Sequence, residues 1–533
     1  MKKIIALLLA LVLAVSCFVA CEQKPVETQP KDDPKPTDSK PVETDPVETE
    51  PENLFDGKHD IVEVTWCVRH NPEEDLEQVL DYLNKTYLEP RYNLHLNVIM
   101  TSNSEYNDKM TMMMTGGEDW DICYTASFVN NYWDRVAMGA YYELDQLFDT
   151  AEWKELEAAL PEGLLDWAKV DGKYYGIPNY QIMSSPSALF VRKDLLDKYN
   201  IKIEDDSVVG DIYEHAGLMK LLDEVNENEP TVIPMAFVGQ AYGTVAWNGE
   251  SEFRNVGSYD YASYYKDTTD YKVFWADQDP AYQEYYLDMW EDRIEFAKKG
   301  YFQDDYLTAT NTQDLLKQNA FAIYASTGKP GGGADMTARY GTEYIQIYCS
   351  NKEYYQGSPM TTCTSINYNS KNPLAALKMI SVMWNDLDVY NTFLAGIPDE
   401  HYKKISDTRI EPIADSGYNM VGWGWGCGNQ FNQWLIPGQA DDVWEETKAM
   451  NENGMIDTTN GFTVNREPYQ TEYGNLQTLA KEWTNWQWYC KDRAELEAKY
   501  KEYLEAQKEC GIEKVIEEVG KQLQDWAKAN GKL

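Results

Sequence analysis

The sequence has no apolar run long enough to cross a bilayer comfortably, and it is poor in cations. The longest apolar run, residues 4–15, is shorter than the about 20 residues that a transmembrane helix needs. Lys and Arg number 47 against 89 Asp and Glu, which gives a formal net charge of −42. This charge excludes nucleic acid as a partner, because nucleic-acid binding needs clustered cations that face phosphate. It also opposes adhesion to anionic lipid.

Paired cysteines, metal-ligand spacings and catalytic motifs are missing as well. The five histidines are scattered, and no Cys-x-x-Cys pair, nucleophile elbow, zinc motif or phosphate loop occurs. An odd number of dispersed cysteines follows Cys21, which is not a disulfide scaffold. We expect free buried thiols, with single disulfides left open, and no cofactor, metal or catalytic residue. These cysteines are Cys67, Cys123, Cys349, Cys363, Cys427, Cys490 and Cys510.

The N-terminus carries a targeting signal. Lys2 and Lys3 precede the short apolar run, and small residues follow it, which is typical of a cleaved signal peptide. The segment 18–21, Phe-Val-Ala-Cys, resembles the end of a bacterial lipoprotein signal. That resemblance implies cleavage after residue 20 and a diacylated, palmitate-type lipid anchor on Cys21. Cys17 is the competing acceptor, but it would leave an apolar Phe-Val-Ala directly after the anchor. A plain secretory signal is the remaining alternative.

Residues 21–56 predict a disordered tether behind the anchor. The motif Pro-Val-Glu-Thr begins at Pro25, Pro41 and Pro46, and the residues between are mostly Lys, Asp, Pro and Thr. Nothing here can be buried, so ordering the segment would cost backbone entropy without compensating contacts. Its position after an acylation signal indicates a spacer that holds a folded part away from the membrane.

The folded part opens with the alternation of a doubly wound α/β domain. The expected elements are a strand over 61–68, a helix from Pro72 with apolar residues at helical spacing, a strand over 94–100, a helix capped by Ser104 and ended by Gly116-Gly117, and a strand over 120–124. Ligands of such domains bind outside the carboxyl ends of the strands. The loops after residues 66 and 124 are therefore the first places to expect a site.

Several ordered motifs resemble family 1 extracellular solute-binding proteins of ABC transporters, in a long lipoprotein branch. They are Asp-Ile-Cys-Tyr at 121–124, Gly-Ala-Tyr-Tyr-Glu-Leu-Asp at 139–145, Asp-Gly-Lys-Tyr-Tyr-Gly-Ile-Pro at 171–178, Leu-Phe-Val-Arg-Lys-Asp-Leu-Leu at 189–196, Ala-Gly-Ile-Pro at 395–398 and Gly-Asn-Gln-Phe-Asn at 428–432. Each motif is weak alone, but their order spans most of the mature chain. Asp171-Gly172 is also a hairpin signal by its own chemistry.

The resemblance implies an α/β fold with two lobes joined by a hinge, in which a ligand is enclosed. We expect lobe 1 to contain residues 57–181 and 327–386, and lobe 2 to contain 187–324 and 390–533. Crossings between the lobes are expected near 179–187, 320–328 and 386–396. Two C-terminal helices, over 494–508 and 512–526, are expected to pack on lobe 2 without any chemistry of their own.

Aromatic residues make up 13% of the chain, and rings with polar tips suit sugars. The predicted ligand-binding residues are Trp66, Arg69, His70, Tyr124, Ser127, Tyr180, Trp247, Asn248, Trp423, Trp425 and Asn429. For Trp66, Trp423 and Trp425, packing in the core is the alternative to ligand contact. In the segment Gly422-Trp423-Gly424-Trp425-Gly426, the alternating glycines would leave the two rings free to act as a stacking platform.

The sequence thus favours a lipid-anchored, extracellular binding protein that captures a neutral or weakly charged oligosaccharide for an ABC importer. Its expected partners are the ligand, with peptide left open, the permease subunits, and the membrane through the anchor. We expect a monomer that is not an enzyme. The alternatives are a surface glycan or peptide receptor without transport, and a secreted carbohydrate-active enzyme.

Overall fold

The computed structural model describes residues 54–184, 186–209, 212–213, 215–236, 253–256, 262–265, 268–309, 312–349, 355–356, 362–456, 458–459, 462 and 464–533. The predicted signal peptide, the predicted anchor at Cys21, nearly all of the predicted tether, Trp247 and Asn248 lie outside these residues. Leu54–Leu533 form one compact unit. In the described part of this unit, no helix has both the length and the apolar character needed to cross a membrane.

The first sheet follows the alternation that the sequence predicts. In sheet order its strands are β2 (Leu94–Thr101), β1 (Val62–Arg69), β3 (Ile122–Thr125), β16 (Cys363–Ile366) and β6 (Ile177–Pro178). β2, β1 and β3 are parallel, and β16 is antiparallel to β3 and to β6. The carboxyl ends of β1 and β3 therefore meet at one edge of the sheet.

Helices of this part are α2 (Leu76–Leu83), α3 (Glu89–Tyr92), α4 (Tyr106–Gly116), α5 (Tyr132–Ala137), α6 (Ala151–Glu157), α13 (Pro373–Asn385) and α14 (Leu387–Ala395). The N-cap of α4 is Glu105 rather than the expected Ser104, and the helix ends at Gly117, whose φ of 65° suits glycine. The expected hairpin is present: β4 (Lys169–Val170) pairs with β5 (Lys173–Tyr174) around Asp171 and Gly172, both with positive φ.

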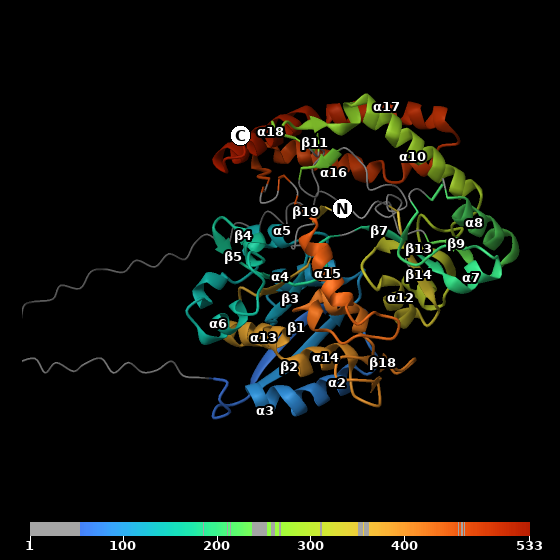
Figure 1. Cartoon of the computed structure of the whole chain (residues 1–533). Coiled ribbons are helices and arrows are strands. Elements are labelled where there is room, and N and C mark those ends of the chain that lie inside the picture. Colours follow the sequence, from blue (N-terminus) through green and yellow to red (C-terminus); the bar gives the residue numbers. More distant parts are fainter. Residues whose placement is uncertain are drawn as a thin grey trace, which may run out of the picture. The chain divides into compact units, whose positions relative to one another are not determined.

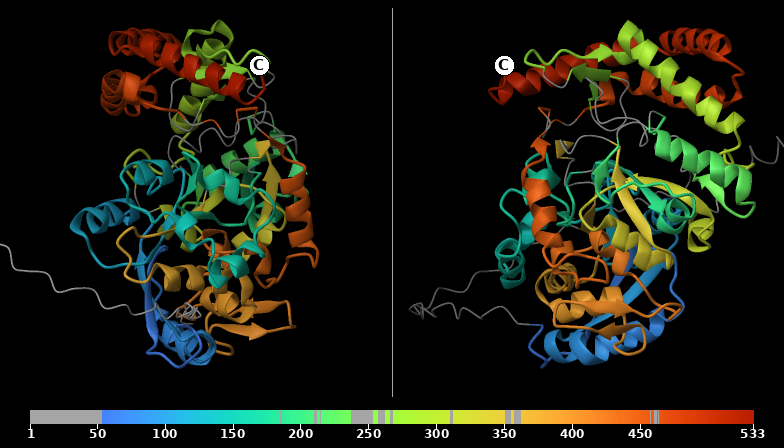
Figure 2. Two further views of the ribbon diagram at one scale, coloured as in Figure 1. Left: turned by 90° about the vertical axis from the view of Figure 1, so that its left-hand side faces the viewer. Right: turned by 45° about the vertical axis from the view of Figure 1, so that its right-hand side comes forward.

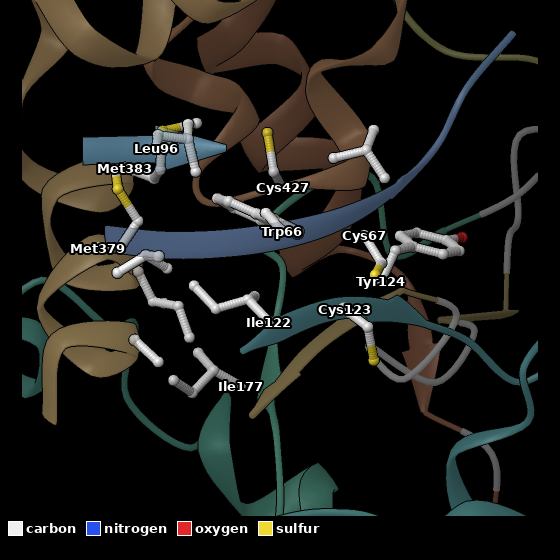
Figure 3. Packing of buried hydrophobic residues seen from close by; sticks show 14 of the residues in the cluster. Trp66, Cys67, Leu96, Ile122, Cys123, Tyr124, Ile177, Met379, Met383 and Cys427 are labelled. Carbon is white, nitrogen blue, oxygen red and sulfur yellow. The ribbon is translucent and has the colours of Figure 1, made fainter. Parts of the chain in front are cut away.

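One large hydrophobic core lies on this sheet. Trp66 and Ile122 from neighbouring strands share it with Met379 and Met383 of α13 (Figure 3). The indole of Trp66 is 1% exposed and stacks on Phe393 of α14 at a centroid distance of 6.1 Å. Residues from α14 onward therefore belong to the same core as β1.

The second sheet consists, in order, of β8 (Ser207–Val208), β14 (Tyr344–Tyr348), β7 (Ser187–Arg192), β13 (Phe321–Thr327) and β9 (Ile233–Met235). β7 is central and antiparallel to both β13 and β14. The helices here are α7 (Lys193–Lys198), α8 (Ala216–Asn228), α11 (Thr312–Lys317), α12 (Gly332–Tyr340) and part of α10 (Pro280–Lys298). The chain passes from the first sheet to the second between Pro178 and Ser187.

The expected lobe boundaries differ from the structure in two places. β14, placed by the prediction in lobe 1, pairs with β7 of the second sheet. Tyr390, Phe393 and Trp423, placed in lobe 2, lie in the first core.

Two of the expected crossings also differ from the structure. β13 pairs with β7 from Ile323 to Thr327, so the chain does not cross at residues 320–328, and residues 386–396 are mostly helix α14. The chain returns to the first sheet between Tyr348 and Cys363. Gly331, with a φ of 72°, is the N-cap of helix α12.

The C-terminal region forms helices that pack together. α16 (Gln470–Glu482), α17 (Arg493–Glu509) and α18 (Ile512–Ala529) lie beside α10 and the small sheet of β10 (Phe253–Asn255), β11 (Ala262–Tyr265) and β12 (Phe274–Trp275), as Figures 1 and 2 show. α17 contacts α10, and α18 contacts β11 and β12. The two predicted helices are therefore confirmed. The remaining elements are α15 (Val443–Glu452) and the strand pairs β15 (Tyr355–Gln356) with β19 (Met455–Ile456) and β17 (Tyr402–Lys404) with β18 (Ile410–Pro412).

A hydrogen-bonded carboxylate joins α17 to the small sheet. Asp277 accepts a hydrogen bond from the Tyr500 hydroxyl at 2.7 Å and one from the Trp275 indole at 3.2 Å. We expect Tyr500→Phe to lower the free energy of unfolding by about 1–2 kcal/mol, because the carboxylate loses one of its donors. Urea denaturation measures this change. The control is Tyr489→Phe at a 70% exposed ring, and equal stability of the two variants would contradict the prediction.

Candidate functional site

Three aromatic rings meet at the carboxyl edge of the first sheet. Tyr124, near the end of β3, lies with its ring centroid 6.2 Å from Trp423 and 6.1 Å from Trp425. The two indoles are 6.1 Å apart. They come from the 3-10 segment η6 (Val421–Gly426), nearly 300 residues later in the chain. We call Tyr124, Trp423 and Trp425 the aromatic cluster.

The glycines of η6 allow the two indoles to take different positions. A Cβ at Gly426 would lie 2.3 Å from the ring of Trp423, so that ring packs directly on the glycine backbone. Trp423 is 4% exposed, whereas Trp425 is only half-buried and donates its indole N–H to the Gly422 carbonyl at 3.1 Å. Trp423 thus serves mainly to pack the core, whereas the ring of Trp425 is accessible to a ligand.

Buried polar atoms without partners surround the aromatic cluster. The Tyr124 hydroxyl, the Trp423 indole nitrogen, the Nε of Arg69 and the amide nitrogen of Asn179 have no hydrogen-bond partner among the described residues. Buried polar groups are otherwise almost always satisfied, because an unpaired one costs about 1–3 kcal/mol. These four atoms therefore offer a ligand donors beside apolar ring faces, the combination that a sugar requires.

His70 lies at the border of the cluster. Its ring is 6.3 Å from Trp423 at a steep angle, and its Nδ1 is 2.8 Å from the Asn71 carbonyl. The pKa of His70 is lowered to about 4, mainly by burial and less by the charges of Arg339, Lys317 and Arg69, against the opposing hydrogen bond to Asn71. Burial outweighs the carboxylate of Glu73, whose Oε1 lies 3.3 Å from Nδ1. His70 is thus neutral at pH 7 and can either donate or accept a hydrogen bond.

The lowered pKa of His70 predicts a loss of stability in mild acid. Between pH 6.5 and about 4 the unfolded chain binds a proton at His70 that the folded protein does not bind, so the free energy of unfolding falls as the pH falls through this window. Melting curves between pH 7 and 4 should show a smaller loss for His70→Gln than for the natural chain. Parallel losses would contradict this origin.

Tyr180 and Asn429 are brought together as a second part of the site. Tyr180 donates its backbone N–H to Gly428 at 2.9 Å and accepts from Gln430 at 2.8 Å, which holds the crossing segment against the loop that carries Asn429. Thr362 joins this part to the aromatic cluster, because its carbonyl accepts from Asn179 and its hydroxyl donates to Trp425. The ring of Tyr180 is half-buried against Phe431.

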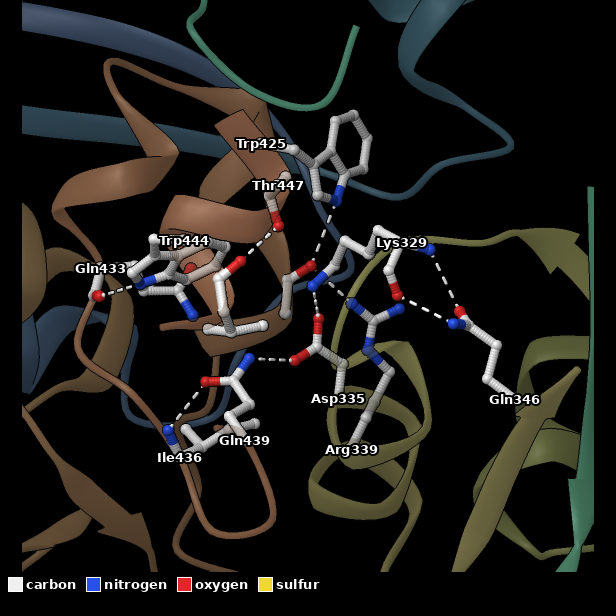
Figure 4. Close-up of polar contacts among 12 residues, drawn as sticks. Lys329, Asp335, Arg339, Gln346, Trp425, Gln433, Ile436, Gln439, Trp444 and Thr447 are labelled. Carbon is white, nitrogen blue, oxygen red and sulfur yellow. Dashed lines mark hydrogen bonds and ion pairs between the residues drawn. The ribbon is translucent and has the colours of Figure 1, made fainter. Parts of the chain in front are cut away.

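The second sheet reaches the same loops through α12 and the turn before it. Arg339 donates to the Gly422 carbonyl at 2.6 Å, the same carbonyl that Trp425 contacts (Figure 4). Asp335 accepts from Gln439 at 2.6 Å and forms an ion pair with Lys329, whose Nζ lies 5.4 Å from the ring of Trp444. These contacts connect elements of the two sheets beside the aromatic cluster.

The remaining predicted residues lie outside the aromatic cluster. Trp66 lies in the core, because Val64, Trp66 and Val68 alternate toward the buried face of β1. Ser127 is half-buried, and its carbonyl accepts from Asn131. The neighbouring Phe128, which the prediction did not include, is 53% exposed and lies under the guanidinium of Arg69 at 5.4 Å. Asn179, Thr362 and Arg339 were also missed, since no local motif relates them to the strand ends.

Known proteins of similar sequence and fold are solute-binding proteins. A carbohydrate ABC transporter substrate-binding protein of Streptococcus pneumoniae is 23% identical over 402 residues, 75% of this chain and 78% of that protein. The structure of the N-glycan transport solute-binding protein of the same organism, in complex with Man1GlcNAc, superposes with a TM-score of 0.73 at 20% identity and covers 87% of this chain and 99% of that one. The chain is thus similar to solute-binding proteins of ABC transporters and shares their fold.

Other solute-binding proteins share the fold at lower similarity. The HMO-binding solute-binding protein of Bifidobacterium longum infantis has a TM-score of 0.52 at 12% identity, covering 87% of this chain and 99% of that one. Residues 458–528 match a family described as a domain of unknown function, DUF3502, which corresponds to helices α16 to α18. The chain therefore has the two-lobed α/β fold that its motifs predict, and the relatives named here are binding proteins.

Proposed function

We propose that this chain is the extracellular binding component of an ABC importer and that it captures a carbohydrate between its two lobes. The observation that carries the proposal is the aromatic cluster at the carboxyl ends of β1 and β3, with unpaired polar atoms beside open ring surface. A ring face and nearby donors are what a saccharide needs, since its C–H faces stack and its hydroxyls accept hydrogen bonds. The named sugar binders among its relatives support the same ligand class.

The proposed ligand contacts come from both parts of the site, and they leave Trp66 out. They are Arg69, His70, Tyr124, Ser127, Tyr180, Trp423, Trp425 and Asn429.

We further propose that the protein carries a lipid anchor at Cys21, is a monomer without enzymatic activity, and is recognised in its closed state by permease subunits. A ligand that contacts both lobes binds the closed state more tightly, and this difference in affinity sets how far the population shifts.

A thermal-shift screen of the purified protein against saccharides and peptides tests the proposal. A ligand that binds only the folded protein must raise the melting temperature. We expect at least one oligosaccharide to raise it and peptides to leave it unchanged. If a peptide alone raises it, the carbohydrate proposal fails. Release of sugar fragments on incubation would contradict the expectation that the protein is not an enzyme.

A further inference from the structure

Three cations near His70 form no salt bridge in the described part of the chain. Arg69 comes from β1, Arg339 from α12 and Lys317 from α11. Among the described residues, none of the three forms an ion pair with a carboxylate. All three lie close enough to His70 to disfavour its protonation. Positive charge from elements beside both sheets therefore lies near His70.

Several other arginines pair with carboxylates, although Arg135 and Arg293 also form no ion pair among the described residues. The chain has 89 acidic residues for 47 basic ones, so a cation readily finds a carboxylate. Arg91, Arg192, Arg409, Arg466 and Arg493 each form at least one ion pair. Arg69 instead lies over the ring of Phe128 with its Nε buried and unpaired, and Arg339 donates to a backbone carbonyl.

Glu73 is an acidic side chain in contact with His70. Its carboxylate accepts from the Asn419 backbone at 3.2 Å, and burial raises its pKa, while that hydrogen bond and the charge of Lys317 lower it. Arg69 and Arg339 form no ion pair with Glu73: Arg69 lies over the Phe128 ring, and Arg339 donates to the Gly422 carbonyl that also accepts from Trp425. A guanidinium with free N–H groups is the side chain best suited to a planar carboxylate.

We infer that the saccharide bound here carries a carboxylate, as a hexuronic acid does, and that Arg69 and Arg339 bind that group while Trp425 stacks on a sugar ring. The inference rests on the proposed function and names the substrate class of the same site. It replaces the neutral or weakly charged oligosaccharide that the sequence favours. An acidic protein that imports an acidic ligand needs such a local reversal of charge, because its overall field repels the ligand.

Pairs of oligosaccharides that differ only in one hexose or the corresponding hexuronic acid test this inference by titration calorimetry. We expect the acidic member to bind at least about tenfold more tightly, as a charged contact in a partly buried site does. Raising the salt concentration should weaken the acidic member alone. Arg69→Gln and Arg339→Gln should each reduce the preference for the acid, measured as the ratio of the two affinities within the same variant.

Arg69→Lys should retain part of the preference, because the charge stays while the forked geometry is lost. The control is Arg91→Gln, whose ion pairs with Asp386 and Asp388 lie elsewhere, and it should retain all of the preference. Equal or tighter binding of the neutral member, or an unchanged preference in both glutamine variants at unchanged melting temperature, overturns the inference and leaves the proposed function intact. If neither member of any pair binds, both fail.

Discussion

Replacing Trp425 with alanine is expected to weaken saccharide binding by about 30-fold or more. Truncating a central aromatic contact costs on the order of 2 kcal/mol or more, and about 1.4 kcal/mol corresponds to a factor of ten in affinity. Trp425 is half-buried and is held by a hydrogen bond to Gly422, so its ring is both accessible and oriented. Titration calorimetry with the saccharide identified by the thermal-shift screen measures the loss.

Comparing Trp423→Ala with Trp425→Ala separates the packing role of the first indole from the ligand contact of the second. Because the Trp423 ring is 4% exposed and lies on the backbone of Gly426, its removal should lower the free energy of unfolding by about 3–5 kcal/mol. Trp425→Ala should lower the free energy of unfolding by less than this amount. Trp167→Ala, at a half-buried indole that belongs to the edge of the first core, is the control and should keep full affinity. Unchanged affinity in Trp425→Ala would place that residue among the structural ones.

The second large effect is expected at Trp66, where we predict a loss of stability rather than of recognition. Trp66→Ala should lower the free energy of unfolding by about 3–5 kcal/mol, since it removes a 1% exposed indole from the core. The stacking on Phe393 ties β1 to helix α14, so the variant also loosens the support under η6. Urea denaturation of the two proteins measures the difference.

Trp66→Phe is the matched variant. It keeps a ring against Phe393, so it should recover most of the stability and bind saccharide like the natural chain. A Trp66→Ala protein of full stability that no longer binds saccharide would contradict the packing role and return Trp66 to the ligand contacts.

Local signals in the sequence were sufficient for the elements that begin the fold. The alternation over residues 61–124 gives β1, α2, β2, α4 and β3 within a few residues, because apolar periodicity and chain breakers act locally. The hairpin at Asp171-Gly172 was predicted from turn chemistry for the same reason. The strand ends also pointed to Arg69, His70 and Tyr124, since parallel strands bring their carboxyl ends to one edge.

Long-range pairing is what the sequence could not provide. Tyr344–Tyr348 reads as an ordinary buried strand, and nothing in its pattern shows that it pairs with β7 rather than with the first sheet. Trp423 and Trp425 were equally ambiguous, because their exposure depends on how η6 folds over Gly426. Arg339 lies on an amphipathic helix, where an arginine is typical of a solvated face. Only its contact with Gly422, 83 residues later, connects it to the site.

The most direct test of the central claim is a crystal structure of the protein with the saccharide that binds most tightly. The account predicts a sugar ring stacked on Trp425, hydroxyl groups within hydrogen-bond distance of the Tyr124 hydroxyl and the Asn179 amide, and closure of both lobes around the ligand. Saccharide bound away from the carboxyl ends of β1 and β3, with the aromatic cluster untouched, would contradict it.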